Sequence, residues 1–351
     1  MPEYHIAVVG VGAVGEELLR VLAEHRFPAR KITVLARSQR TITVDGSAYD
    51  VQETTPEAFD GVDIALFAGT EGEKGAAVTF GPEAVKRGAV VIDNGADFRM
   101  RPDVPLVVPE VNAAALRDHK GVIANPNCST AQLVLALKPL HDAARIKRVW
   151  VSTYQAVSGA GGAAVTELKA QNQALAEGRA ITEAGPVFPV QIAANIIPQI
   201  GGFDASGYTS EEMKLVHETR KIMGDNSLRI TPMVAARVPV TIGHSEAVSV
   251  ETERSLTPDE ARALWHDFPG ITVLDERDGS DPYRAYPTPL FAAGKDMTYV
   301  GRIRQDLENP NGLNFWIVSD NLRKGAATNA VQIAESLIDQ NLLGHTHGSI
   351  F

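Results

Sequence analysis

The sequence predicts an α/β protein of two domains: a doubly wound parallel-sheet domain and an α+β domain with a mixed or antiparallel sheet. The chain has 351 residues, whereas single hydrophobic cores stop growing at about 250–300 residues. Before Pro126, short β-rich segments alternate with helix-like ones, which is typical of a parallel sheet. After Pro126, strand-rich segments predominate. We therefore expect one domain at 1–127 plus 321–351 and a second at 128–320.

The first domain follows from alternating apolar segments. Leu18, Leu19 and Leu22 recur at helical spacing within a predicted helix at 16–24, and a second helix is predicted at 79–87. The expected strands are 4–9, 32–35, 64–67, 90–93 and 106–108. A last helix over 325–342 is expected to complete this domain. It opens on Gly325, Ala326 and Ala327, which suits close approach to another backbone or to a ligand.

The second domain combines helices with strand-rich sequence. Leu133, Leu137 and Leu140 form an apolar stripe on a predicted helix at 129–144. Further helices are expected at 163–177 and 210–223, and a strand at 148–155. The strand-rich segments are 230–253, 271–275 and 297–319, with no regular helix expected between them. This pattern favours a mixed or antiparallel sheet.

Composition excludes several classes of protein. The 33 Lys+Arg and 43 Asp+Glu give a net charge of −10, which argues against a generic nucleic-acid or anionic-membrane binder. No apolar segment approaches the roughly 20 residues that cross a bilayer. No basic segment precedes the first apolar stretch, so we expect no signal peptide and a cytoplasmic location. Cys128 is the only cysteine, so neither an intrachain disulfide nor a cysteine-based zinc cluster can form, and no metal site is expected.

A glycine-rich turn follows the first predicted strand and opens the first helix. Glycines at these positions permit a tight turn, close approach of pyrophosphate and close packing of helix on strand. The helix start presents free N–H groups to phosphate. The alternative is a tight turn without a ligand, but its position between strand and helix favours a Rossmann dinucleotide site. The predicted cofactor-binding residues are Gly10, Gly12, Ala13, Val14 and Gly15.

The end of the second strand indicates which dinucleotide binds. NAD sites usually place an acidic residue there to hold the ribose 2′-hydroxyl. This chain has Arg37, Ser38 and Arg40 instead, which suit a 2′-phosphate through charge-assisted hydrogen bonds. An exposed basic loop is the alternative interpretation. We expect NADP(H), without knowing which of the three side chains holds the phosphate.

Cys128 is predicted to lie at the N-terminus of a helix. Pro126 favours extended backbone before it, and Ser129 and Thr130 suit a first helical turn. The helix dipole favours a thiolate there, which is typical of a nucleophile. Free cysteines are also often inert packing residues, so position alone leaves both interpretations open.

The surrounding motifs separate these interpretations. The segments are ANPNCSTAQLVLALKPL, VSTYQAVSGAGG, YTSEEMKLVHETRKIMG, RVPVTIGHSEAVSVE and FWIVSDNLRKGAATNAVQIAE. In this order, over essentially the whole chain, they resemble aspartate-β-semialdehyde dehydrogenases. The resemblance implies NADP-dependent, reversible interconversion of L-aspartyl phosphate and L-aspartate-4-semialdehyde, in the biosynthesis of lysine and diaminopimelate, threonine and methionine. It also implies a homodimer or a dimer of dimers.

The resemblance assigns roles to individual residues. It makes Cys128 the nucleophile, His244 the acid–base residue and Gln155 the residue that orients the acyl intermediate. It places the substrate carboxylate at Arg237 and the substrate amine at Glu211. The remaining implied residues are Lys214 and Arg99 for phosphate, Asn127 beside the nucleophile, and Ser158, Gly159 and Asn321 on the cofactor side. Without the resemblance, Glu211 with Lys214 would be an ordinary surface ion pair, and Arg99 a solvated charge.

The spacing of Arg237 and His244 makes a geometric prediction. They are seven residues apart, so a regular strand would point them to opposite faces. Pro239 and Gly243 lie between them and can supply a break. We therefore expect irregular backbone here.

Two segments depart from the pattern expected of the family. Residues 68–73 carry Glu71 and Glu73 in place of a serine-rich turn, close to an expected phosphate site. Residues 94–99 are more similar to N-acetyl-γ-glutamyl-phosphate reductases, which act on a longer, acetylated substrate and are the main alternative. Glu211 favours the free-amine aspartyl substrate. A second alternative is a non-catalytic NADP-binding homologue. The presence of Cys128 together with Gln155, Arg237 and His244 argues against it.

Overall fold

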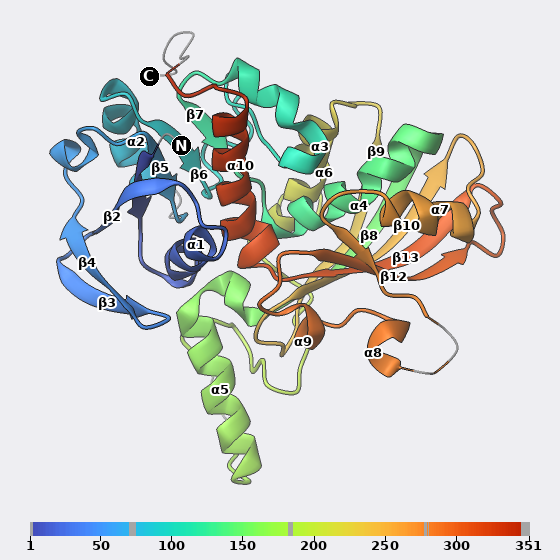
Figure 1. The fold of residues 1–351 in the computed structure, drawn as a ribbon. Coiled ribbons are helices and arrows are strands. Elements are labelled where there is room, and N and C mark those ends of the chain that lie inside the picture. The colour runs from blue at the N-terminus through green and yellow to red at the C-terminus, as the bar shows by residue number, and fades with distance from the viewer. Residues whose placement is uncertain (1–2, 70–74, 182–184, 277–278, 280, 345–351) are drawn as a thin grey trace. The chain divides into compact units, whose positions relative to one another are not determined.

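The structure is a computed structural model that describes residues 3–69, 75–181, 185–276, 279 and 281–344. The chain forms two compact units, residues 1–127 with 326–351 and residues 128–325, so that 321–325 group with the second. A seven-stranded sheet lies in the first unit and a six-stranded sheet in the second (Figure 1). The predicted α/β class is confirmed.

The first unit is a mostly parallel sheet with strand order β3-β4-β2-β1-β5-β6-β7. Among the strands of the described residues, the β3–β4 pair alone is antiparallel. The residues of β5 and β6 are all buried, as expected for inner strands covered on both faces. The elements are β1 (Tyr4–Val9), α1 (Ala13–Glu24), β2 (Ala29–Ala36), β3 (Arg40–Val44), β4 (Ser47–Glu53), β5 (Ile64–Phe67), α2 (Ala76–Lys86), β6 (Val90–Asp93), α3 (Pro109–Asn112), β7 (Val122–Ala124) and α10 (Thr328–Asp339).

Helix α10 belongs to the first unit although it comes from the end of the chain. Its apolar residues share one buried cluster with those of α1 and of the sheet, and Figure 1 shows the two helices side by side. The buried Asn329 amide donates to Val107 O at 2.9 Å and to Asn125 Oδ1 at 2.6 Å. Apolar packing and these hydrogen bonds together hold α10 on this unit.

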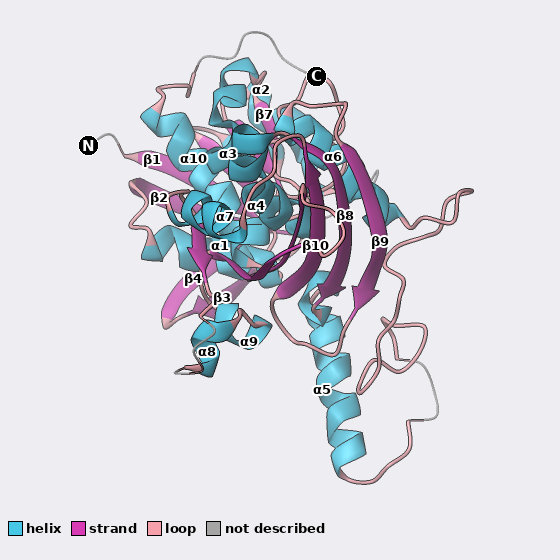
Figure 2. Cartoon of the chain, turned by 90° about the vertical axis from the view of Figure 1, so that its right-hand side faces the viewer, coloured by secondary structure: helices cyan, strands magenta, loops and turns pink. Residues whose placement is uncertain are grey.

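The second unit has a mixed sheet with order β11-β12-β13-β10-β8-β9. The two pairs β11–β12 and β8–β9 are parallel and the others antiparallel; Figure 2 shows β8, β9 and β10 lying alongside one another. Trp265 of α7 is fully buried, and its indole donates to Ala136 O of α4 at 2.8 Å. The elements are α4 (Cys128–Ala144), β8 (Ile146–Gln155), α5 (Gly162–Ala176), α6 (Ser210–Met223), β9 (Arg229–Arg237), β10 (His244–Thr252), α7 (Pro258–His266), β11 (Ile271–Val273), α8 (Pro282–Ala285), α9 (Pro289–Ala292), β12 (Thr298–Gln305) and β13 (Gly312–Ser319).

Two predictions about elements are wrong. The strand expected at 106–108 is only a single bridge between Leu106 and Ala124, because the chain turns into α3 at Pro109. No regular helix was expected between the strand-rich segments 230–253, 271–275 and 297–319, yet α7, α8 and α9 lie there. The boundary of α7 is marked by a capping box between Thr257 and Glu260. Of the described residues, no helix is long and apolar enough to span a membrane.

Candidate active site

The first unit presents a glycine turn between β1 and α1. Gly10 has a φ of +101°, and a Cβ on Gly15 would lie 1.9 Å from Gly10 O, so the backbone requires glycine at both positions. A Cβ on Gly12 would meet no atom within 4 Å. Ala13 and Val14 then begin α1. Because its N-cap residue is Gly12, no N-cap side chain occupies the first N–H groups of the helix. The turn therefore has open space beside a helix N-terminus, which fits a pyrophosphate.

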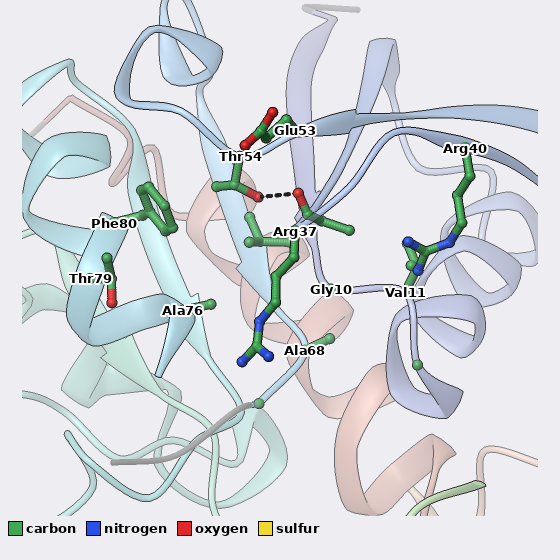
Figure 3. A pocket seen from close by; sticks show the side chains of 14 residues that line it. Gly10, Val11, Arg37, Arg40, Glu53, Thr54, Ala68, Ala76, Thr79 and Phe80 are labelled. Atoms are coloured by element: carbon green, nitrogen blue, oxygen red, sulfur yellow. Dashed lines mark hydrogen bonds between the residues drawn. The ribbon is translucent and has the colours of Figure 1, made fainter. Parts of the chain in front are cut away.

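A cavity of about 650 Å³ adjoins this turn. In Figure 3 the Arg37 side chain extends into the cavity, whereas Arg40 lies on the side of Val11. Arg40 Nη1 donates to Ser38 Oγ at 3.1 Å. The lining residues are Val9, Gly10, Val11, Gly12, Ala36, Arg37, Arg40, Glu53, Thr54, Ala68, Gly69, Ala76, Thr79 and Phe80. Space, glycine backbone and guanidinium groups together fit a dinucleotide.

The cavity also contains a residue that sequence reasoning missed. Glu53, exposed at the end of β4, lines the cavity with Arg37. The β3–β4 hairpin that presents it was not predicted, although its turn residues Asp45 and Gly46 both have positive φ and are a strong hairpin signal. The expected departure at Glu71 and Glu73 lies outside the described residues.

Arg99 and Asn127 are buried in the first unit. The Arg99 guanidinium donates to Asn125 O at 2.9 Å and to Asn94 O at 2.7 Å. Asn94 in turn donates to Phe67 O, at the end of β5. Arg99 is therefore no solvated surface charge, because backbone carbonyls fix it at the carboxyl ends of the parallel strands.

Cys128 is the first residue of α4 and is partly exposed. A Cβ on Gly325 would lie 2.7 Å from the Cys128 Cβ. The small residue expected to allow close approach at Gly325 thus faces the start of α4. The backbone of Gly325 therefore packs directly against Cys128.

Arg237 and His244 lie on one side of the second unit, as the predicted backbone break requires. Strand β9 ends at Arg237 and β10 begins at His244, and Gly243 between them has a φ of +98°. A Cβ on Gly159 would lie 2.9 Å from Arg237 Nη1 and 3.1 Å from His244 Nε2. Both side chains therefore contact the same glycine, and the predicted irregularity is confirmed.

One residue of the turn after β8 orients both side chains. The N–H of Ala156 donates to His244 Nδ1 at 3.0 Å, and its carbonyl accepts from Arg237 Nη1 at 2.6 Å. The next residue, Val157, donates to Val240 O at 2.8 Å. Sequence reasoning missed Ala156, because its contribution is made by peptide groups that leave no side-chain signal.

The hydrogen bond at Nδ1 sets the state of His244. Because Nδ1 accepts, the neutral ring carries its proton on Nε2, and this buried nitrogen has no partner among the described residues. Burial, and secondly the charge of Arg237, lower the pKa of His244 well below its usual value. An ordinary imidazole titrates near pH 6.5, whereas the structure presents a neutral ring with an N–H donor.

Burial also affects Arg237. It lowers the pKa of this guanidinium, whereas the charges of Cys128 and Glu211 raise it. Arg237 therefore interacts electrostatically with both the thiol and the carboxylate, and a cation in this position favours a thiolate.

Glu211, Lys214 and Gln155 form a connected polar group. Lys214 Nζ lies 3.2 Å from Glu211 Oε2, and Gln155 Nε2 donates to Glu211 Oε1 at 3.3 Å. Helix α6 coincides with the predicted 210–223, because Thr209 and Glu212 form a capping box at its start. Glu211 and Lys214 are three residues apart on α6 and so share one helix face, which Gln155 joins to the end of β8.

Asn321 and Ser158 connect three loops of the second unit. Asn321 Oδ1 accepts from the Gly243 N–H at 2.9 Å and from Ser158 Oγ at 3.1 Å. This amide therefore fixes the loop before His244 and the turn that holds Gly159. Among the described residues, no group of three or more His, Cys, Asp or Glu side chains could hold a metal ion.

Comparisons with known proteins agree with this arrangement. Residues 5–119 match the family described as semialdehyde dehydrogenase, NAD binding domain, and residues 137–324 match its dimerisation domain. The chain is 48% identical to an aspartate-semialdehyde dehydrogenase of Aquifex aeolicus over 97% of this chain and 99% of that one. A Bacillus subtilis enzyme of the same name is also 48% identical, with the same coverage. A crystal structure of aspartate semialdehyde dehydrogenase II from Vibrio cholerae, complexed with ASA, has a TM-score of 0.89 at 44% identity and covers 97% of this chain and 99% of its own.

Substitution of two glycines separates fold from ligand binding in the first unit. Gly15→Ala should lower the free energy of unfolding by about 1–3 kcal/mol, because its Cβ overlaps Gly10 O. Gly12→Ala should leave stability unchanged and weaken NADPH binding about tenfold, since its methyl occupies open space where pyrophosphate is expected. Chemical denaturation and NADPH fluorescence titration measure the two effects. Equal NADPH affinity in wild type and Gly12→Ala would contradict the assignment.

The tautomer of His244 can be observed directly. In ¹⁵N NMR spectra, assigned with His244→Gln, its ring should be neutral with the proton on Nε2 between pH 6.5 and 8. Its titration midpoint should lie below 6.5, because burial and Arg237 disfavour the imidazolium. A midpoint at or above 6.5, or a proton on Nδ1, would show that the Ala156 hydrogen bond does not control the ring.

Proposed function

The chain belongs to the aspartate-semialdehyde dehydrogenase family, and from this premise we propose that it interconverts L-aspartyl phosphate and L-aspartate-4-semialdehyde with NADP(H) and phosphate. The observation that carries the proposal is the position of Arg237 and His244 against Gly159, with Arg237 coupled to the thiol of Cys128. A nucleophile, a donor and a substrate cation are the groups that reduction of an acyl phosphate through a covalent thioester needs.

Cys128 performs the first step. Its sulfur attacks the acyl carbon of aspartyl phosphate, the bond from that carbon to the phosphate oxygen breaks, and phosphate leaves with the electron pair. The thiolate is favoured by the helix N-terminus and by Arg237. We assign Gln155, at the end of β8, the orientation of the resulting thioester.

His244 stabilises the tetrahedral species on both sides of the thioester. Its Nε2–H is the donor for the oxygen that becomes negative when the acyl carbon is attacked. Reduced nicotinamide, when bound, supplies the hydride that turns the thioester into a thiohemiacetal. Collapse of that adduct releases the aldehyde and returns the electron pair to the Cys128 sulfur. We assign His244 the donating part of the acid–base role, because Nδ1 is occupied by Ala156.

Charged residues select the substrate. Arg237 can hold the α-carboxylate through two parallel hydrogen bonds, a geometry that lysine cannot reproduce. Glu211 is the partner for the free ammonium, with Lys214 and Arg99 for phosphate and Asn127 beside the nucleophile. An acetylated amine carries no charge for Glu211, so the N-acetylated substrate of the alternative reductase is not favoured.

The cofactor assignment follows the cavity of the first unit. Arg37, Ser38 and Arg40 suit a 2′-phosphate, and the glycine turn suits the pyrophosphate. On the nicotinamide side we assign Ser158, Gly159 and Asn321. These assignments make the chain an NADP-dependent oxidoreductase.

We also propose a homodimer formed through the second unit. The face of its sheet opposite the buried side of β10 carries Trp150, Tyr154 and Trp316, which are only half-buried in the single chain. Aromatic side chains on an open sheet face are typical of a subunit interface. The match to a dimerisation domain over 137–324 supports this surface.

The assay follows from the chemistry. Wild type should reduce NADP⁺ with L-aspartate-4-semialdehyde over many turnovers only when phosphate is present, because phosphate must release the acyl group from Cys128, and NAD⁺ should serve less well. Cys128→Ala should abolish the reaction and leave NADPH affinity within about threefold, because the thiol forms the covalent bond. Since Cys128 is the only thiol, one alkylation should account for all loss of activity. Activity with N-acetylglutamate semialdehyde alone, or an unchanged rate in Cys128→Ala, would overturn the proposal.

Gly159 offers a matched test of site geometry. A methyl at Gly159 overlaps Arg237 and His244, so Gly159→Ala should lower kcat/KM about 10- to 100-fold. Gly162→Ala, three residues on, meets no atom within 4 Å and should keep wild-type kinetics. Steady-state rates of the two variants, with circular dichroism as the folding control, make the comparison. An equal loss of kcat/KM in Gly159→Ala and Gly162→Ala would show that a change in the turn itself, rather than contact with Arg237 and His244, lowers the rate.

A further inference from the structure

A fully buried carboxyl group lies in the second unit without an assigned role. Glu246 follows His244 by two residues on β10, so both point to the same face of the sheet. Its side chain is 0% exposed, and neither carboxyl oxygen has a hydrogen-bond partner among the described residues. An unpaired buried carboxyl is costly, and nothing in the reaction described above uses it.

Two polar neighbours of Glu246 connect it to the thiol site. Across the sheet, Glu246 pairs with Thr153 of β8, whose Oγ1 accepts a hydrogen bond from Gln155 Nε2 at 3.3 Å. From α4, Gln132 interacts with the Glu246 carboxyl, and it lies one turn after Cys128. Glu246 and its partner Thr153 therefore lie two residues along their strands from His244 and Gln155, on the same face of the sheet.

Gln132 has an unused donor. Its Oε1 accepts a short hydrogen bond, 2.5 Å, from Ser319 Oγ of β13, whereas its Nε2 is buried without a partner among the described residues. Ser319 lies opposite His244 in the β10–β13 pair. The amide of Gln132 and the carboxyl of Glu246 are thus two buried groups without another partner among the described residues, and they are near enough to interact with each other.

We propose that Glu246 is a positioning residue for the thiol site. It closes a buried polar chain through Gln132 to Ser319, and so holds the N-terminal part of α4 against β10. Through Thr153 it also supports Gln155. This inference rests on the proposed function, because the role given to Glu246 is to keep Cys128 and the Nε2–H donor of His244 in position relative to each other.

The protonation state of Glu246 makes this role depend on pH. Burial raises the pKa of Glu246 to about 8, and the amide of Gln132 acts in the opposite direction. The titratable groups nearest along the packed elements are His244 on β10 and Cys128 on α4. At neutral pH the carboxyl is therefore uncharged and can both donate and accept. Above pH 8 it becomes a buried anion that can only accept hydrogen bonds, and we expect this change in the polar chain to disturb the position of Cys128.

Three variants test the proposal. Glu246→Gln keeps the shape and is neutral at every pH; Glu246→Leu keeps the volume and removes the polar group. Thr252→Val is the matched control, since Thr252 is also buried on the same face of β10 but bonds to Arg254 O and Asn311 O, away from the thiol. For each, kcat, KM and the rate of Cys128 alkylation by iodoacetamide are measured from pH 6.5 to 9.5.

Expected results separate positioning from simple stability. Glu246→Leu should lose at least tenfold in kcat at pH 7 with KM within threefold, and its alkylation rate should change. Glu246→Gln should match wild type at pH 7, and the ratio of its kcat and alkylation rate to those of wild type should rise at least threefold by pH 9.5. The folded-state pKa is raised, so wild type loses stability as pH rises from the unfolded value through about 8. The Tm advantage of Glu246→Gln should accordingly grow with pH.

For Thr252→Val, the ratios of kcat and of alkylation rate to those of wild type should not depend on pH.

A pH-independent ratio for Glu246→Gln, or wild-type kcat in folded Glu246→Leu, would overturn the proposal. If wild type shows no semialdehyde turnover, the proposed function fails instead. The alkylation ratios then still decide whether Glu246 acts on Cys128, because alkylation needs neither substrate nor cofactor.

Discussion

The two peptide groups of Ala156 set the geometry of the thiol site. One donates to His244 and the other accepts from Arg237, so the turn after β8 fixes a donor and a cation that come from the ends of two other strands. A regular strand cannot present Arg237 and His244 on one face, because they are seven positions apart. The break at Gly243 and the missing side chain at Gly159 are the consequences of this arrangement.

Burial gives these few groups their chemical properties. His244 is neutral because it is buried beside a cation, and Glu246 is protonated because it is buried without one. The protein carries a net charge of −10, yet Arg237 and Lys214 lie with Glu211 in one polar group of the second unit. Positive charge is therefore concentrated locally, where an anionic substrate needs it.

The sequence predicts more of the framework than of the electrostatics. Glycine spacing, helix periodicity and the cap at Thr209 are local signals, and they located the dinucleotide turn and α6 correctly. The break between Arg237 and His244 was also predictable, from Pro239 and Gly243. Helix α7 was missed despite the capping box at Thr257. The orienting peptide groups of Ala156 and the pKa values of His244 and Glu246 depend on packing between distant segments, and no local pattern records them.

The central claim is that Cys128 carries the acyl group as a thioester. Its most direct measurement is mass spectrometry of protein quenched in acid after mixing with L-aspartate-4-semialdehyde and NADP⁺ without phosphate, followed by peptide mapping. If Cys128 carries the acyl group, one aspartyl group is added per chain, on the peptide that contains Cys128, and phosphate releases it. No adduct during NADPH formation, or an adduct on another residue, would contradict the account.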